Sequence, residues 1–148
     1  MKEFIDLLEK KCAYFTVDGG KISVGGYLDL RGTGITTLPD NLSVGGSLGL
    51  EGTGITNLPD NFSCDSLYLD HEKISNVAYR TNCGYSSRTI FAAWAGKEFR
   101  IAAGCFFGSI ADFESAVDDK YSGDAGEKYK QAARECVEEL KVKLNKAA

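Results

Sequence analysis

A twenty-residue unit repeats in the first half of this chain and constrains its fold more than any other feature. The segment VGGYLDLRGTGITTLPDNL at 24–42 is followed by VGGSLGLEGTGITNLPDNF at 44–62. A third copy is one residue shorter at its start and keeps only the apolar positions, which are Leu67, Leu69, Ile74 and Val77. A fixed period of this length predicts a solenoid, in which one unit cannot bury its own apolar face and stacks on the next.

The pattern within each unit predicts one short strand and two turns. Leu28 and Leu30 alternate with outward residues, which is the two-residue period of a strand with one buried face. The glycines that precede this strand, Gly25 and Gly26, allow a tight bend or a close approach of backbones that a side chain would obstruct. Three further apolar residues later in the unit are expected to return to the interior.

The motif LxLxGTxITxLPDNL, with its Gly-Gly spacer, resembles the short leucine-rich repeats of bacterial and bacteriophage proteins, close to the LPxxL-containing type of bacterial effectors. The resemblance covers residues 24–77. It departs from the usual pattern at Thr33 and Thr53, which stand where an asparagine would normally form a hydrogen-bonded ladder. The resemblance implies parallel strands and a protein-binding scaffold without catalytic residues. The C-terminal segment, with its GCFFGS sequence, resembles tails found beside such repeats in prophage proteins of unassigned role.

We therefore expect an α+β fold, a short leucine-rich-repeat solenoid closed at both ends. Residues 1–23 are expected to hold a capping helix and a lead-in, and residues 24–79 the repeat stack. The helix is predicted over residues 2–13, because its apolar residues share one face at helical spacing. Those residues are Phe4, Ile5, Leu8 and Cys12. A hairpin around Asp18-Gly-Gly is predicted to follow this helix.

Residues 80–148 are expected to form a C-terminal unit of one β-hairpin and two helices. The strands are predicted over 89–95 and 98–103, after a polar connector over 80–88. Ser109 is expected to cap the first helix, and Asp124 the second. The second helix has an apolar stripe, formed by Tyr129, Ala133, Cys136, Leu140 and Leu144.

Charge is distributed unevenly along the chain, whose net charge is −4. Between residues 12 and 72 there are eight acidic and only two basic residues, whereas residues 73–148 carry ten acidic and twelve basic residues. The repeats are therefore the acidic part. This balance argues against direct binding to nucleic acid and favours a basic protein surface as the partner.

The outward positions of the predicted strands are the leading candidates for a binding site. In a stack they form columns on the sheet face, and Ser66 is expected to complete the column of Tyr27 and Ser47. The candidate partner-binding residues are Tyr27, Asp29, Arg31, Ser47, Glu51, Tyr68 and Asp70. The alternative is a solvated sheet face without a partner, because so few units offer little area for an interface.

Catalytic and metal-binding patterns are weak in this sequence. The five cysteines include no CxxC pair, and His71 is the only histidine, so no metal and no cofactor is expected. The aspartates at 40 and 60 could ligate calcium, but aspartate is also typical of such turns. The enzymatic alternative is a cysteine nucleophile in the C-terminal unit, either Cys83 or Cys105.

These patterns together favour a non-enzymatic binding protein in a bacterial cytoplasm. No apolar run approaches the ~20 residues of a membrane span, and the first apolar stretch contains acidic residues, unlike a signal peptide. If the resemblance to phage-borne proteins holds, the expected role is inhibition of host defence. An anti-CRISPR-like protein could place negative charge in the DNA-binding site of a nucleic-acid-binding subunit of a defence complex.

Overall fold

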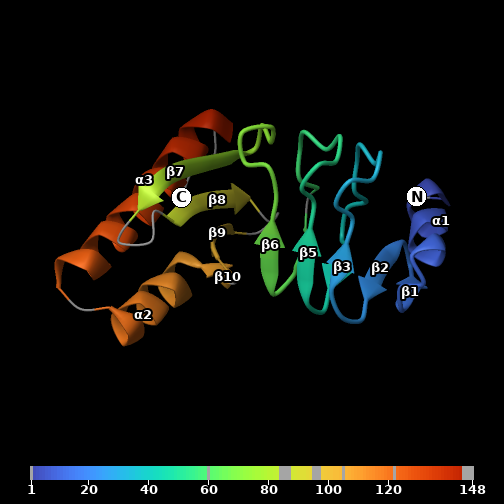
Figure 1. Cartoon of the computed structure of the whole chain (residues 1–148), viewed down its shortest axis with the longest axis horizontal. Coiled ribbons are helices and arrows are strands. Elements are labelled where there is room, and N and C mark those ends of the chain that lie inside the picture. Colours follow the sequence, from blue (N-terminus) through green and yellow to red (C-terminus); the bar gives the residue numbers. More distant parts are fainter. Residues whose placement is uncertain are drawn as a thin grey trace.

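The protein has an α+β fold in which helices lie at both ends of an elongated series of strands (Figure 1). The computed structural model describes residues 2–59, 61–83, 88–94, 98–104, 106–121 and 123–144. Within these ranges the strands form three sheets, one mixed, one parallel and one antiparallel.

The repeated units supply the parallel sheet. It consists of β3 (Leu28–Asp29), β5 (Ser47–Gly49) and β6 (Ser66–Tyr68), which lie side by side in chain order. Leu28 is opposite Leu48, and Leu48 is opposite Leu67. Each of these leucines is at most 2% exposed. Equivalent leucines of the three copies therefore share one interior, as the repeat predicts.

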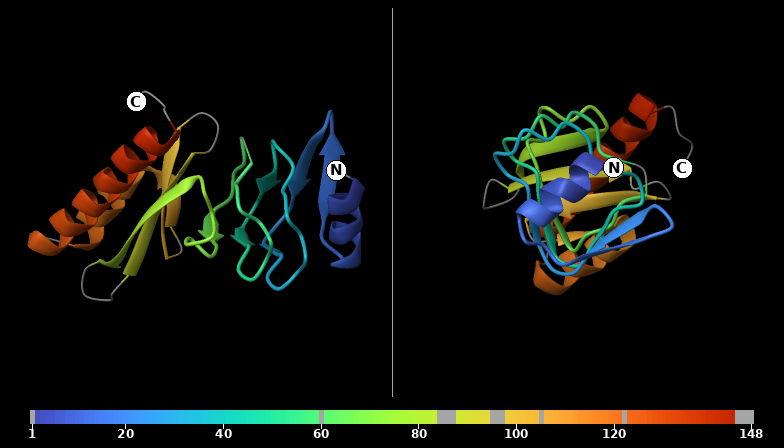
Figure 2. Two further views of the ribbon diagram at one scale, coloured as in Figure 1. Left: turned by 90° about the horizontal axis from the view of Figure 1, so that it is seen from above. Right: turned by 90° about the vertical axis from the view of Figure 1, so that its right-hand side faces the viewer.

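The N-terminal segment closes one end of this stack. Helix α1 (Lys2–Lys10) lies across that end, and its buried Phe4 and Leu8 join the repeat core (Figure 2). The predicted helix extends too far, because Cys12 adopts a left-handed backbone with φ 57°. Cys12 is also exposed, so its predicted place in the core is wrong.

A hairpin follows α1, as predicted. Strands β1 (Phe15–Asp18) and β2 (Lys21–Val24) pair antiparallel, and β2 pairs in parallel with β4 (Ser43–Val44). The tight turn needs glycine, since Gly19 and Gly20 both have positive φ, 57° and 81°.

The C-terminal unit is built on a four-stranded antiparallel sheet of order β10-β9-β8-β7. Its strands are β7 (Val77–Cys83), β8 (Arg88–Trp94), β9 (Phe99–Ala103) and β10 (Phe106–Ser109). The central hairpin of β8 and β9 is the predicted one. Strands β7 and β10 were not predicted from the sequence. Strand β7 crosses the expected domain boundary at residue 79 and includes the start of the segment expected to be a connector. Both β7 and β10 are edge strands of the sheet. Their sequences, polar at the end of β7 and flanked by glycine in β10, resemble those of loops.

Two helices follow the sheet at the predicted places. Helix α2 (Ile110–Lys120) is capped by Ser109, whose hydroxyl accepts a hydrogen bond of 3.1 Å from the Asp112 N–H. Helix α3 (Asp124–Leu144) begins at Asp124, so this residue lies in the first turn and is not the predicted cap. The helix buries most of its predicted stripe, although Leu144 is only partly buried.

The antiparallel sheet separates two cores. Phe91, Ala93, Ala102 and Phe107 pack with the repeats, whereas the intervening Ile90, Ala92, Ile101 and Ala103 pack with α2 and α3. One sheet thus closes the second end of the stack and also carries the helices on its other face (Figure 2).

Candidate partner-binding face

Six of the seven candidate residues surround one shallow hollow on the parallel sheet. The hollow has a volume of about 300 Å³. It is lined by Tyr27, Leu28, Asp29, Arg31, Ser47, Gly49, Glu51 and Tyr68. Asp70 is not among the lining residues. The structure therefore brings residues from three copies of the repeat to one place on the surface.

Gly49 makes this hollow possible. It lies in one row of the sheet between Asp29 and Tyr68. A Cβ placed on Gly49 would be only 3.4 Å from Cγ of Arg31, which shows that the arginine side chain folds across this position. A larger residue at 49 would displace that side chain and fill the centre of the hollow.

Asp29 and Arg31 form a two-pronged ion pair beside Gly49. Nε of Arg31 donates to Oδ1 of Asp29 at 2.8 Å, and Nη2 donates to Oδ2 at 3.0 Å. The Arg31 N–H also donates to Oδ1, at 3.1 Å. These hydrogen bonds lower the pKa of Asp29 to about 2, so both partners are charged at neutral pH. Their charges cancel, and the negative charge of this face comes from Glu51 and Asp70.

Asp70 orders the neighbouring turn. Its Oδ2 accepts a hydrogen bond of 2.9 Å from the Gly52 N–H, and Nζ of Lys73 lies 3.8 Å from the same oxygen. Asp70 therefore links the second and third units beside the hollow, while Glu51 lines it.

Two tyrosines flank the hollow, but the serine column differs from the prediction. Tyr27 is 76% exposed and Tyr68 is 37% exposed. Ser47 is half-buried, whereas Ser66, expected to face solvent, is only 6% exposed. That expectation is wrong because β10 packs beside β6 at the end of the stack. A strand more than thirty residues further along the chain thus covers this position.

The repeats also contain an amide ladder that the sequence analysis missed. Nδ2 of Asn61 donates to Oδ1 of Asn41 at 3.0 Å, and both residues have positive φ. Thr33 and Thr53 instead donate to backbone carbonyls within their own units, each at 2.7 Å. The signal was present in the sequence, since both copies carry Pro-Asp-Asn at the same place. Asp60 lies outside the described residues, so the proposed aspartate pair is not placed.

The thiols of Cys64, Cys83 and Cys136 are poorly suited to nucleophilic chemistry at neutral pH. Burial raises the pKa of Cys64 and of Cys136 to about 12. Burial also raises the pKa of Cys83, and Cys105 lies outside the described residues. The His71 ring packs against Tyr79, with 4.3 Å between ring centroids. Among the residues that the structure describes, no cluster of three potential metal ligands occurs.

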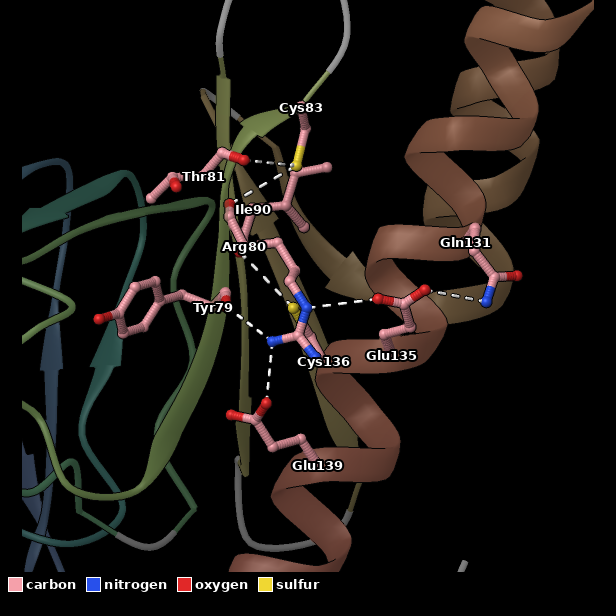
Figure 3. A network of polar contacts seen from close by, with 9 residues as sticks. All are labelled: Tyr79, Arg80, Thr81, Cys83, Ile90, Gln131, Glu135, Cys136 and Glu139. Carbon is pink, nitrogen blue, oxygen red and sulfur yellow. Dashed lines mark hydrogen bonds and ion pairs between the residues drawn. The ribbon is translucent and has the colours of Figure 1, made fainter.

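Arg80 is held within the C-terminal unit by ion pairs with two glutamates of α3. It extends from β7 toward α3, where it lies between two glutamates (Figure 3). Nη1 donates to Glu139 at 2.9 Å, and Nε donates to Glu135 at 3.3 Å. Figure 3 also shows Cys83 and Cys136 beside this network, both near Ile90.

Comparison with protein-family models, with curated proteins and with solved structures finds no match for this chain. Across the described ranges, no helix is both long enough and apolar enough to cross a membrane.

Proposed function

We propose that this protein is a non-enzymatic binding module of the short leucine-rich-repeat class that contacts a partner protein through the hollow on its parallel sheet. The observation that supports this most strongly is the convergence of six predicted residues on one hollow. The backbone of the sheet fixes these residues before binding, which lowers the entropy lost on association.

The chemistry of the hollow favours a basic side chain of the partner. The Asp29–Arg31 pair is neutral, so Glu51 gives the lining a net negative charge. The exposed tyrosine rings can pack against the aliphatic stem of a lysine or against an arginine guanidinium. The partner that fits is therefore a basic protein surface, and the acidic composition of the repeats adds long-range attraction.

A nucleic-acid-binding subunit of a host defence complex would provide such a surface. This more specific role, inhibition of defence by a phage-encoded protein, rests on the acidity of the repeats and on their resemblance to phage-borne repeats. A cysteine-dependent enzyme has less support, because burial raises the pKa of Cys83, Cys64 and Cys136.

The proposal is tested by affinity capture from bacterial lysate with matched baits. One bait is the unaltered protein, and the other carries Tyr27→Ala, Glu51→Lys and Tyr68→Ala. The control bait carries Val142→Ala, an exposed position on α3. We expect a captured protein to be retained by the control and lost from the triple variant. Retention also by the folded triple variant would show that the hollow is not the binding site.

A further inference from the structure

Strand β3 is the first strand of the parallel sheet, and its outer edge resembles the edge of β5 on which β3 itself packs. Within the stack, the backbone of the first unit packs against the glycine pair of the second unit, Gly45 and Gly46. A Cβ on Gly46 would lie 2.9 Å from the backbone N of Tyr27, and a Cβ on Gly45 would lie 3.1 Å from the N of Gly26. The backbones of successive units therefore approach one another as closely as glycine permits.

The same positions in the first unit face open space. A Cβ on Gly25, the equivalent of Gly45, would meet no atom within 4 Å, and the same holds for Gly34, the equivalent of Gly54. Ile35 is likewise only partly buried, whereas its equivalent Ile55 is 2% exposed. The first unit thus has the same glycines and isoleucine with which the second unit packs on its neighbour, and in the first unit these residues are partly uncovered.

The N-terminal segment covers only part of this end. The Tyr14 carbonyl accepts a hydrogen bond of 2.9 Å from the Gly25 N–H. In the stack, the Val24 carbonyl accepts the equivalent bond from Gly45 at 2.8 Å. Beyond this contact a groove of about 530 Å³ opens between the N-terminal segment and β3. It is lined by Lys11, Cys12, Ala13, Tyr14, Gly25, Gly26, Tyr27, Leu28 and Asp29.

We propose that this groove binds one extended segment of a partner polypeptide, which adds to the edge of β3 and runs parallel to it. The parallel direction follows from the internal example, since β3 itself pairs in parallel with β5. A single segment fits because residues 11–14 form the opposite wall of the groove. Tyr14, 85% exposed, and Tyr27, 76% exposed, would both be covered.

The structure also defines the character of this segment. Its backbone must approach Gly26 closely, as the Tyr27 backbone of the first unit approaches Gly46 of the second, because Tyr14 already occupies the N–H of Gly25. Strand addition therefore depends on main-chain contacts along β3. Lys11 carries the one charge of the groove lining that is not balanced there, because the Asp29 charge is paired with Arg31, and this disfavours a strongly basic segment. The occupant is therefore an extended, uncharged or weakly acidic segment. This inference does not depend on the function proposed for the hollow.

The test uses the synthetic peptide VGGYLDLRG, which has the sequence of residues 24–32 and forms this contact with the second unit in the structure. The peptide is titrated into ¹⁵N-labelled protein and followed by NMR, with a scrambled peptide as control. We expect shifts confined to the amides of residues 11–14 and 25–29. A nitroxide at the N-terminus of the peptide should broaden Gly25 more than Arg31, and one at its C-terminus should do the reverse.

Gly25→Val should weaken peptide binding by roughly tenfold or more while leaving the thermal unfolding midpoint unchanged, because its side chain projects into the groove. Val142→Ala is the control for binding. The proposal is overturned by shifts centred instead on Ser47, Glu51 and Tyr68, which line the hollow but not the groove, by the opposite broadening pattern, or by unaltered peptide binding to the folded variant. It is also overturned if the protein dimerises through this edge, which sedimentation velocity would detect.

Discussion

Asp29 and Arg31 turn two neighbouring outward positions of one strand into a single rigid feature. Side chains two residues apart on a strand lie on the same face, so their opposite charges can meet without distorting the backbone. The two hydrogen bonds between their side chains, at 2.8 and 3.0 Å, hold Arg31 across Gly49. The shape of the hollow therefore depends on this pair as much as on the tyrosines.

Replacing Arg31 by glutamine should raise the pKa of Asp29 from about 2 toward its ordinary value of 3.8, because the hydrogen-bonding guanidinium is lost. The folded pKa lies below the ordinary value, so the pair contributes stability above about pH 4 and loses it as the pH falls toward 2. The Asp29 carboxyl carbon is followed by NMR. The control is Arg134→Gln, which removes an arginine of α3 that pairs with Glu114 and not with Asp29. An unchanged Asp29 titration would contradict the role assigned to Arg31.

The sequence predicts which way the side chains of this sheet point, but not whether solvent reaches them. The alternation around Leu28 predicted that Asp29 and Arg31 face outward, and their spacing already allowed a contact between them. Burial of Ser66 was not predictable in this way, since it depends on packing of β10 beside β6. Short-range patterns report the direction of a side chain, whereas distant segments decide whether solvent reaches it.

At the scale of elements, the glycine pairs set the distance between successive units. Gly46 has no side chain, and the backbone of Tyr27 occupies the space that a Cβ would need. Gly45 is crowded in the same way by the backbone of Gly26, whereas its equivalent in the first unit, Gly25, has no such neighbour. Equivalent glycines of the two copies therefore have different structural roles.

Gly46→Ala should destabilise the protein by about 1–3 kcal/mol, because a Cβ 2.9 Å from a backbone nitrogen forces adjacent units apart. The control is Gly25→Ala, at a glycine of the first unit with open space around it, and it should change the free energy of unfolding by no more than ~0.5 kcal/mol. Urea denaturation of both variants measures the difference. Equal stability of the two variants would mean that the units do not stack through these glycines.

Most elements follow from local signals, and the missed ones share a physical cause. The Asp-Gly-Gly hairpin carries its own turn residues, and helix α2 carries its own cap, Ser109. Strand β7 lacks such a signal, because polar residues in the stretch 80–83 resemble a loop until β8 pairs with them. Edge strands of this kind become visible only once their neighbours are known.

At the scale of the molecule, the antiparallel sheet couples the repeats to the C-terminal helices. Phe107 on this sheet stacks on Phe62 of the second unit, with ring centroids 5.8 Å apart. The opposite face of the sheet packs on α2 and α3, and Arg80 links β7 to α3. We therefore expect the whole chain to unfold as one cooperative unit.

Phe107→Ala should lower the free energy of unfolding by ~3–5 kcal/mol, since Phe107 is only 7% exposed and its removal leaves a cavity between the two parts. Val142→Ala, at a position 82% exposed, serves as control. Unfolding is followed by Trp94 fluorescence and by far-ultraviolet circular dichroism. Two separate transitions in the unaltered protein would contradict the single cooperative unit.

The direct backbone contact between the first two units has a consequence for how such a chain can change in length. Its two ends are covered, the first only in part, by structures that differ from the repeats, and each repeat touches mainly its neighbours. Duplication of one twenty-residue segment would separate the ends by about one strand spacing, ~4.8 Å, and leave both closures intact. The distance between the two ends of the stack can therefore increase in fixed steps, one for each added repeat, without any new type of contact.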